Sequence, residues 1–145
     1  MFPLRTLVIA TTMSLAAFSS QAAVNTAGAD LGSNPFYAAS TLPFQAPPFD
    51  KISDGDYQPA IEEGMRQHLA EIEKIANNPA APTFENTFVA MEKSGAMLDR
   101  VMAAFNTVTG ANTDDTLQKI QGQEAPRLAA HRDAIAFNDK RFHRI

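Results

Sequence analysis

Apolar residues recur at helical spacing in three successive segments after residue 55, a pattern that predicts an all-α fold. In the first segment these residues share one side of a helix. Asp56 can cap the start of this helix, which would place Pro59 at the third helical position, where a missing backbone N–H has no cost. The sequence Asn77-Asn78-Pro79 ends the helix. Its apolar side consists of Ile61, Met65, Leu69, Ile72 and Ile75.

The second segment predicts one long helix, capped by Thr83 and ended by Gly110-Ala111-Asn112. An apolar stripe follows it for about six turns, and Gly95 leaves a notch where a neighbouring element can approach closely. We interpret the stripes of both helices as core packing. The second stripe consists of Phe84, Phe88, Met91, Gly95, Leu98, Met102 and Phe105.

The third segment starts at Thr113-Asp114-Asp115, which supplies a cap and two carboxylates to the positive end of the helix dipole. Gly122 and Pro126 lie inside it, and the proline predicts a kink. A further helix can begin at Asn138, but no stop signal follows before Ile145, which we interpret as a sign of truncation. The apolar side of the third helix is marked by Leu117, Ile120, Leu128 and Ile135.

The N-terminus has the layout of an export signal. Arg5 precedes an apolar run over residues 7–18, and small residues follow up to Ala22. The run is shorter than the ~20 residues that span a bilayer, and it lacks the charged face expected of a buried helix over residues 4–18. We therefore predict a signal peptide over residues 1–22, cleavage after Ala22, export to the periplasm, and a flexible spacer over residues 23–33.

Residues 34–55 are rich in proline and aromatic residues. Each proline disfavours helical geometry in the residue before it, which predicts an extended arm. Because disordered linkers are usually poor in aromatic residues, we expect Phe36, Tyr37, Phe44 and Phe49 to dock on a neighbouring surface. The alternative is a disordered proline-rich linker. Residues 56–145 then form the helical segment.

Composition limits the classes of partner. Cysteine is absent, which excludes a lipid-attachment cysteine and disulfides and leaves no membrane anchor after signal cleavage. The chain carries 12 basic and 16 acidic residues. Lys140, Arg141 and Arg144 form the one basic group, which is too small to indicate a nucleic-acid or anionic-membrane partner.

The histidines do not form a recognisable metal motif. His68, His131 and His143 are followed by residues other than glutamate, so none begins the H-E-x-x-H pair of a zinc peptidase. We predict that His68 is a solvated helix residue and that His131 is a hydrogen-bonded histidine in the core or at its boundary.

Other catalytic patterns are also missing. Ser33 and Ser94 lack the G-x-S-x-G elbow that exposes a nucleophile. The neighbouring pairs Glu62-Glu63 and Asp114-Asp115 point in different directions on a helix, so we interpret them as solvated faces and dipole complements. No G-x-G-x-x-G or phosphate-loop pattern occurs. The sequence therefore predicts no catalytic, cofactor-binding or metal-binding residue in this chain.

Short strings in a fixed order carry a family resemblance, dense from residue 34 to residue 105 and thinner towards Ile145. They include Asn34-Pro35-Phe36, Ser40-Thr41-Leu42-Pro43, Phe49-Asp50, Gly64-Met65, Asn78-Pro79, Asn86-Thr87, Ser94-Gly95, Arg100-Val101 and Leu117-Gln118. In these strings the chain resembles the N-terminal region of bacterial peptidyl-dipeptidases, also called dipeptidyl carboxypeptidases, of the thimet-oligopeptidase-like zinc metallopeptidase family.

The resemblance implies that the chain is part of the N-terminal lobe of a larger, mostly helical, two-lobed peptidase. In that family zinc binds to motifs far downstream, the N-terminal helices help to wall a channel that admits short peptides, and dipeptides are released from the C-terminus. The implied partners are short peptides and the missing C-terminal portion of the same protein. This segment alone would be inactive and would bind no zinc. The alternative is an autonomous exported helical module that binds a peptide or protein between its helices.

Overall fold

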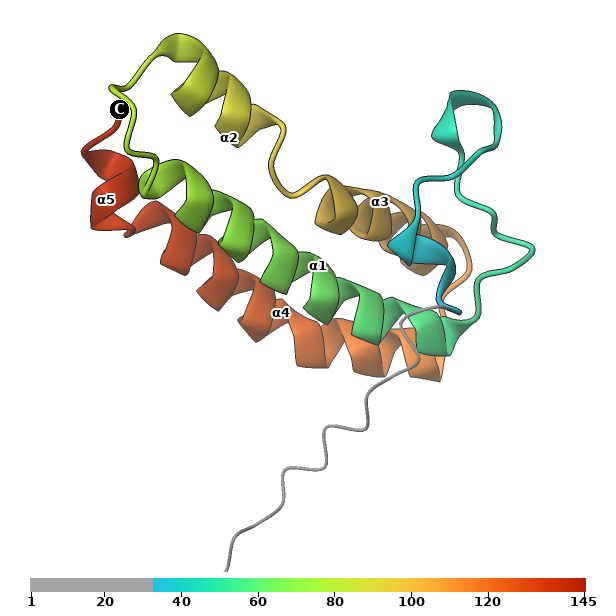
Figure 1. The fold of residues 1–145 in the computed structure, drawn as a ribbon. Coiled ribbons are helices and arrows are strands. Elements are labelled where there is room, and N and C mark those ends of the chain that lie inside the picture. The colour runs from blue at the N-terminus through green and yellow to red at the C-terminus, as the bar shows by residue number, and fades with distance from the viewer. Residues whose placement is uncertain (1–32) are drawn as a thin grey trace, which may run out of the picture.

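The computed structural model describes residues 33–145, and these fold into helices packed around one central helix, α1 (Figure 1). No strand occurs in this range, so the all-α prediction is confirmed. The predicted signal peptide and nearly all of the predicted spacer lie outside the described residues. The helices are α1 (Asp54–Ala76), α2 (Ala90–Glu92), α3 (Ala96–Ala111), α4 (Asp115–Ala136) and α5 (Asp139–Phe142), with shorter turns η1 (Pro35–Tyr37), η2 (Pro43–Gln45) and the π-helical η3 (Phe84–Val89).

Consecutive long helices are antiparallel. Tyr57, near the start of α1, packs against Phe105 in the second half of α3, whereas Gly64 lies against Leu98 near the start of α3. Because α4 reverses direction again, it runs parallel to α1. Figure 1 shows α1 with α3 on one side and α4 on the other. None of the helices within residues 33–145 is sufficiently long and apolar to span a membrane.

The core forms where the arm, α1, α3 and α4 meet. Tyr57 is 2% exposed, and its ring lies 5.4 Å from the ring of Phe36 and 5.3 Å from that of Phe105. Aromatic pairs at this spacing stabilise a core beyond the area that they bury. The buried apolar residues of this cluster are Phe36, Tyr57, Ala60, Ile61, Met97, Leu98, Val101, Ala104, Phe105, Leu117 and Ile120.

The start of α1 differs from the prediction. Ser53, not Asp56, is the N-cap, and Asp56 instead accepts a hydrogen bond of 2.8 Å from the backbone N–H of Ser53. The two residues close a capping box, in which the cap and the third helical residue satisfy each other's backbone donors. Pro59 consequently lies inside α1 rather than at its third position.

The prediction of one continuous second helix is wrong, because the chain breaks at Gly95. This residue has φ = 78°, a left-handed conformation that favours glycine, and it precedes α3. The earlier half of the predicted helix is the separate unit of η3 and α2, and its Phe84 and Phe88 are exposed. The start was predicted correctly, since Thr83 accepts a hydrogen bond from the backbone N–H of Asn86.

Helix α4 continues through Gly122 and Pro126 to Ala136, so neither residue ends the helix. Its N-cap is Asp114, which accepts a hydrogen bond of 2.8 Å from the backbone N–H of Leu117. The predicted start at Asn138 is confirmed, because its side chain caps α5.

The arm docks with only half of its aromatic residues. Phe36 is buried in the core and Tyr37 is half-buried against it, as predicted. Phe44 is fully exposed and Phe49 is 47% exposed, so neither ring docks on a surface within residues 33–145. Asn34 fixes the start of the arm by donating a hydrogen bond of 2.9 Å to the carbonyl of Asp56.

Candidate binding groove

A groove of about 300 Å³ lies between α3 and α4, next to α1. Its walls are mainly apolar and contain a small number of polar side chains, the usual composition of a site that binds an apolar group in a fixed orientation. The lining residues are His68 from α1, Leu98, Asp99 and Met102 from α3, and Leu128, His131, Arg132 and Ile135 from α4.

Two histidines and a serine form a hydrogen-bonded chain at the groove. His131 is buried, and its Nε2 atom lies 3.1 Å from Nδ1 of His68. Nε2 of His68 lies 3.2 Å from Oγ of Ser94, which in turn donates a hydrogen bond of 2.6 Å to the carbonyl oxygen of Met91. The chain joins α4, α1 and the turn after α2 into one polar contact.

The hydrogen bond from Ser94 to Met91 constrains the positions of the protons. The single hydroxyl proton of Ser94 is donated to Met91, so His68 must donate from Nε2 to the serine oxygen. In the tautomer of His68 that carries no proton on Nδ1, this atom accepts a hydrogen bond from Nε2 of His131. Nδ1 of His131 is buried and has no hydrogen-bond partner.

The prediction for His68 is wrong and that for His131 is confirmed. His68 is half-buried and hydrogen-bonded rather than solvated. The sequence contained the signal, because His68 lies three residues after Met65 and four before Ile72, within the apolar stripe of α1. His143, by contrast, is exposed.

The histidine pair does not fit a zinc site. A zinc ion in a protein needs three or four ligands that point at one position. His68 and His131 instead form a hydrogen bond with each other. In the part of the chain that the structure describes, no group of three or more histidine, aspartate or glutamate side chains is placed to hold a metal ion.

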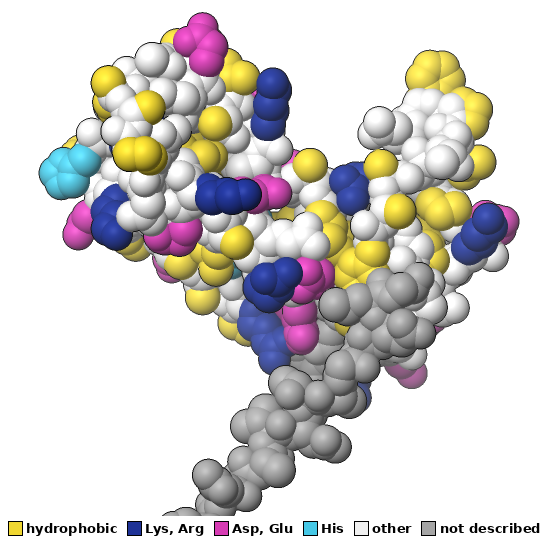
Figure 2. All heavy atoms as spheres, viewed as in Figure 1, with side chains coloured by type: hydrophobic (Ala, Val, Ile, Leu, Met, Phe, Trp, Pro, Cys, Tyr) yellow, Lys and Arg dark blue, Asp and Glu magenta, His cyan; other side chains and the backbone are white. Residues whose placement is uncertain are grey.

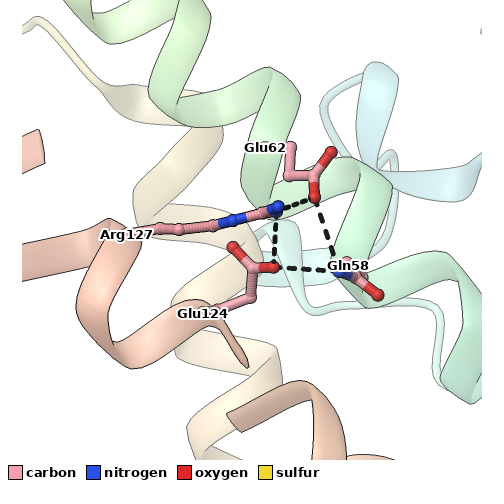
Figure 3. Close-up of polar contacts among 4 residues, drawn as sticks. All are labelled: Gln58, Glu62, Glu124 and Arg127. Carbon is pink, nitrogen blue, oxygen red and sulfur yellow. Dashed lines mark hydrogen bonds and ion pairs between the residues drawn. The ribbon is translucent and has the colours of Figure 1, made fainter. Parts of the chain in front are cut away.

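A second polar cluster, between α1 and α4, includes a buried carboxylate that sequence analysis missed (Figure 3). Glu124 has a side chain that is 1% exposed and accepts hydrogen bonds from Gln58 at 3.0 Å and Arg127 at 3.1 Å. The same Arg127 nitrogen also pairs with Glu62. Oε1 of Glu124 makes these contacts, whereas its buried Oε2 has no partner. This cluster fixes the position of α4 against α1.

The neighbouring carboxylates Glu62-Glu63 and Asp114-Asp115 do not contact each other as pairs. Glu62 and Glu63 have different partners, Arg127 and Arg66. Asp114 instead lies near Asp54, at the adjacent N-termini of α4 and α1. Burial, together with the charge of Asp114 and a hydrogen bond to it, raises the pKa of Asp54.

Removing the buried carboxylate should have a small effect on stability, because Glu124 is desolvated and only half satisfied. We expect Glu124→Leu to lower the free energy of unfolding by less than about 1 kcal/mol or to increase it. Arg127→Leu should cost more than Glu124→Leu, because it leaves the buried carboxylate without its charged donor. Urea denaturation of the two variants measures the difference, and an equal loss in both would contradict this order.

The lowered pKa of His131 predicts a dependence of stability on pH. Burial, followed by the proximity of His68 and Arg132, lowers the pKa of His131. The unfolded chain, with a histidine pKa of ~6.5, binds the proton more readily. Stability should therefore be constant above that value and fall as the pH decreases below it towards the folded-state pKa. Urea midpoints at pH 7.5 and 5.5 measure this fall.

A matched pair of variants isolates the histidine. His131→Gln retains an N–H that can reach His68 and removes the titrating group, so it should flatten the pH dependence. His143→Gln removes an exposed histidine and should leave the pH dependence unchanged. An unaltered slope in His131→Gln would show that other groups cause it.

Comparison with known proteins finds two relatives of this chain that are similar over most of its length. No protein-family model matches it. It is 46% identical over 115 residues to a dipeptidyl carboxypeptidase of Salmonella typhimurium, in a match that covers 79% of this chain and 17% of the relative. It is 46% identical over 112 residues to a dipeptidyl carboxypeptidase of Escherichia coli, covering 77% of this chain and 16% of the relative. The chain thus spans about a sixth of the length of these curated relatives, and the resemblance found in the short strings is confirmed.

Proposed function

Because the chain is a homologue of part of the dipeptidyl carboxypeptidases, we propose that it is a segment of a longer peptidase that releases dipeptides from the C-termini of short peptides. The observation that supports this most directly is the 46% identity to two such enzymes over more than three quarters of the chain. The activity would belong to the longer protein, since the matched part is about a sixth of each relative.

In this proposal the segment helps to wall the substrate channel and is inactive alone. Residues outside the segment would hold the zinc ion, because His68 and His131 are hydrogen-bonded to each other and lack a third ligand. The aromatic core and the Glu124 cluster support a structural role, since they fix α1, α3 and α4 as one unit. The signal-like residues 1–22 support export to the periplasm as part of the same proposal.

The test is to express the longer reading frame and to measure the products from a short unstructured peptide. We expect sequential release of dipeptides from a peptide with a free C-terminus, and loss of this activity after treatment with a chelator. The 145-residue chain, assayed beside it, should release nothing. Release of single residues, or cleavage from the N-terminus, would contradict the proposal.

The groove favours a second candidate, an autonomous helical module that binds a peptide. Leu98, Met102, Leu128 and Ile135 supply apolar walls, and Asp99 and Arg132 supply charges that could orient a ligand. This candidate requires residues 23–145 to unfold cooperatively as a compact monomer and to bind peptides without the remaining polypeptide. A molten or aggregating segment would favour the peptidase.

A further inference from the structure

We propose that a pocket between the arm and α3 binds a small carboxylic acid that carries an apolar group. We call it the arm pocket. It has a volume of about 220 Å³ and lies between the arm and the side of α3 that carries Arg100 and Ala103. Described residues alone form the arm pocket, so the inference depends neither on the peptidase proposal nor on a longer protein.

The walls of the arm pocket are mainly apolar and include three proline rings of the arm. The buried Phe36 and the fully exposed Phe44 both line it, so the pocket extends from the core to the surface. Figure 1 shows the loop of the arm beside α3, and Figure 2 shows this loop standing out from the molecule with the surface hollowed at its base. A pocket of this size accommodates one small group rather than a large cofactor.

The arm pocket presents a positive charge. Within the part of the chain that the structure describes, Arg100 is the one charged residue that lines it. Nη1 of Arg100 donates to the carbonyl of Ala96 at 3.2 Å, and Nη2 donates to the carbonyl of Phe36 at 3.4 Å, a long bond. Nε is buried without an acceptor. The guanidinium therefore has more N–H donors than its protein acceptors use.

No carboxylate of residues 33–145 neutralises this charge, since none forms an ion pair with Arg100. Asp99 is adjacent in sequence but lines the groove between α3 and α4. Asp50 lines a separate hollow of the arm, together with Lys51. Asp56 accepts the hydrogen bond from the backbone of Ser53. The arm pocket thus combines apolar walls with one cation that has no anionic partner.

The loop that forms one wall is strained and held in place. Phe44 has φ = 58° and Gln45 has φ = 56°, left-handed values that cost energy in residues other than glycine. Oγ of Ser40 donates to the carbonyl of Ala46 at 2.6 Å and accepts from the N–H of Leu42 at 3.2 Å, which closes the loop. Strained backbone often occurs where a ligand is held. Both strained residues line the arm pocket.

The charge and the walls together determine the class of ligand. A guanidinium pairs with a planar carboxylate through two parallel hydrogen bonds. A phosphate group carries more charge, and its sites usually combine several backbone N–H groups or cations, whereas this pocket has one cation. Because burying a second charged group against apolar walls is unfavourable, the rest of the ligand should be apolar.

Binding of N-acetylphenylalanine to the 145-residue chain tests the inference, with the uncharged amide of the same compound as the matched ligand. Each is titrated into isotope-labelled protein, and the backbone amide signals are followed by NMR. We expect the acid to shift the signals of Ser40, Gln45 and Ala103. The amide should bind at least about tenfold more weakly, because it cannot form a charge-assisted pair with Arg100.

Two arginine variants locate the charge that matters. Arg100→Gln retains N–H donors but removes the positive charge, so the affinity for the acid should fall at least about tenfold. Arg132→Gln removes a cation from the separate groove between α3 and α4, and it should change the affinity by less than about twofold. Urea midpoints of both variants show whether each remains folded.

Phe44→Ala tests the same pocket without a change of charge, which keeps the test decisive if Arg100→Gln destabilises the fold. Because Phe44 is fully exposed, its loss should leave the urea midpoint unchanged. The affinity for the acid should fall roughly threefold, since the ligand loses part of an apolar wall. Equal binding of the acid and the amide, or unchanged affinity in both Arg100→Gln and Phe44→Ala, would overturn the inference.

Discussion

Replacing Tyr57 by alanine should cost about 3–5 kcal/mol, the usual range for the loss of a large buried aromatic side chain. The ring is 2% exposed and contacts both Phe36 and Phe105, so the substitution empties the place where the arm, α1 and α3 meet. Small domains have total stabilities of roughly 5–15 kcal/mol. We therefore expect a large decrease in the urea midpoint of the chain.

Phe44→Ala provides the control for Tyr57→Ala. Phe44 is another aromatic residue, but it is fully exposed. Its loss should change the free energy of unfolding by less than about 0.5 kcal/mol, as for most surface substitutions. Similar losses in the two variants would show that the core does not lie around Tyr57.

Replacing Gly64 by alanine should destabilise the chain by roughly 1–3 kcal/mol through overpacking. A Cβ atom at this position would lie 2.9 Å from Cα of Leu98 and 3.1 Å from its backbone nitrogen. Because these are backbone atoms, α3 would have to move away from α1. The helix-forming advantage of alanine, ~1 kcal/mol over glycine, offsets only part of this cost.

The control for Gly64→Ala is Gly122→Ala in α4. No atom lies within 4 Å of a Cβ built at Gly122, so only the gain in helix propensity remains. The two glycine-to-alanine changes should shift the thermal midpoint in opposite directions. A shift of the same sign in both would contradict the close contact between α1 and α3.

The sequence predicted the helices well because their apolar spacing is regular. The prediction of the second helix failed because the conformation of a single residue, Gly95, determines the path of the backbone. Gly95 could be read as a notch within one helix or as a left-handed break, and apolar spacing on both sides is compatible with either. The break depends on tertiary contacts, since Glu71 accepts a hydrogen bond of 2.7 Å from the Gly95 N–H and a Cβ would meet the ring of His68.

The polar residues of the candidate sites could have been found from position but not from residue type. His68 lies within the apolar stripe of α1, and Glu124 lies four residues after Ile120 and four before Leu128. Their positions indicate burial. Their partners could not be predicted, because His131 is 63 residues from His68 and Gln58 is 66 residues from Glu124. Such distant pairings depend on the packing of α4.

The parallel arrangement of α1 and α4 has a consequence for biosynthesis. Helix α1 contacts α3, which follows it in the chain, and then α4, which comes later. The hydrogen bonds of Gln58 and His68 with α4 join residues 66 and 63 positions apart. During synthesis, α1 and α3 can therefore pair while α4 is still inside the ribosome. One side of α1 then remains open to water and to chaperones until nearly the whole segment has emerged.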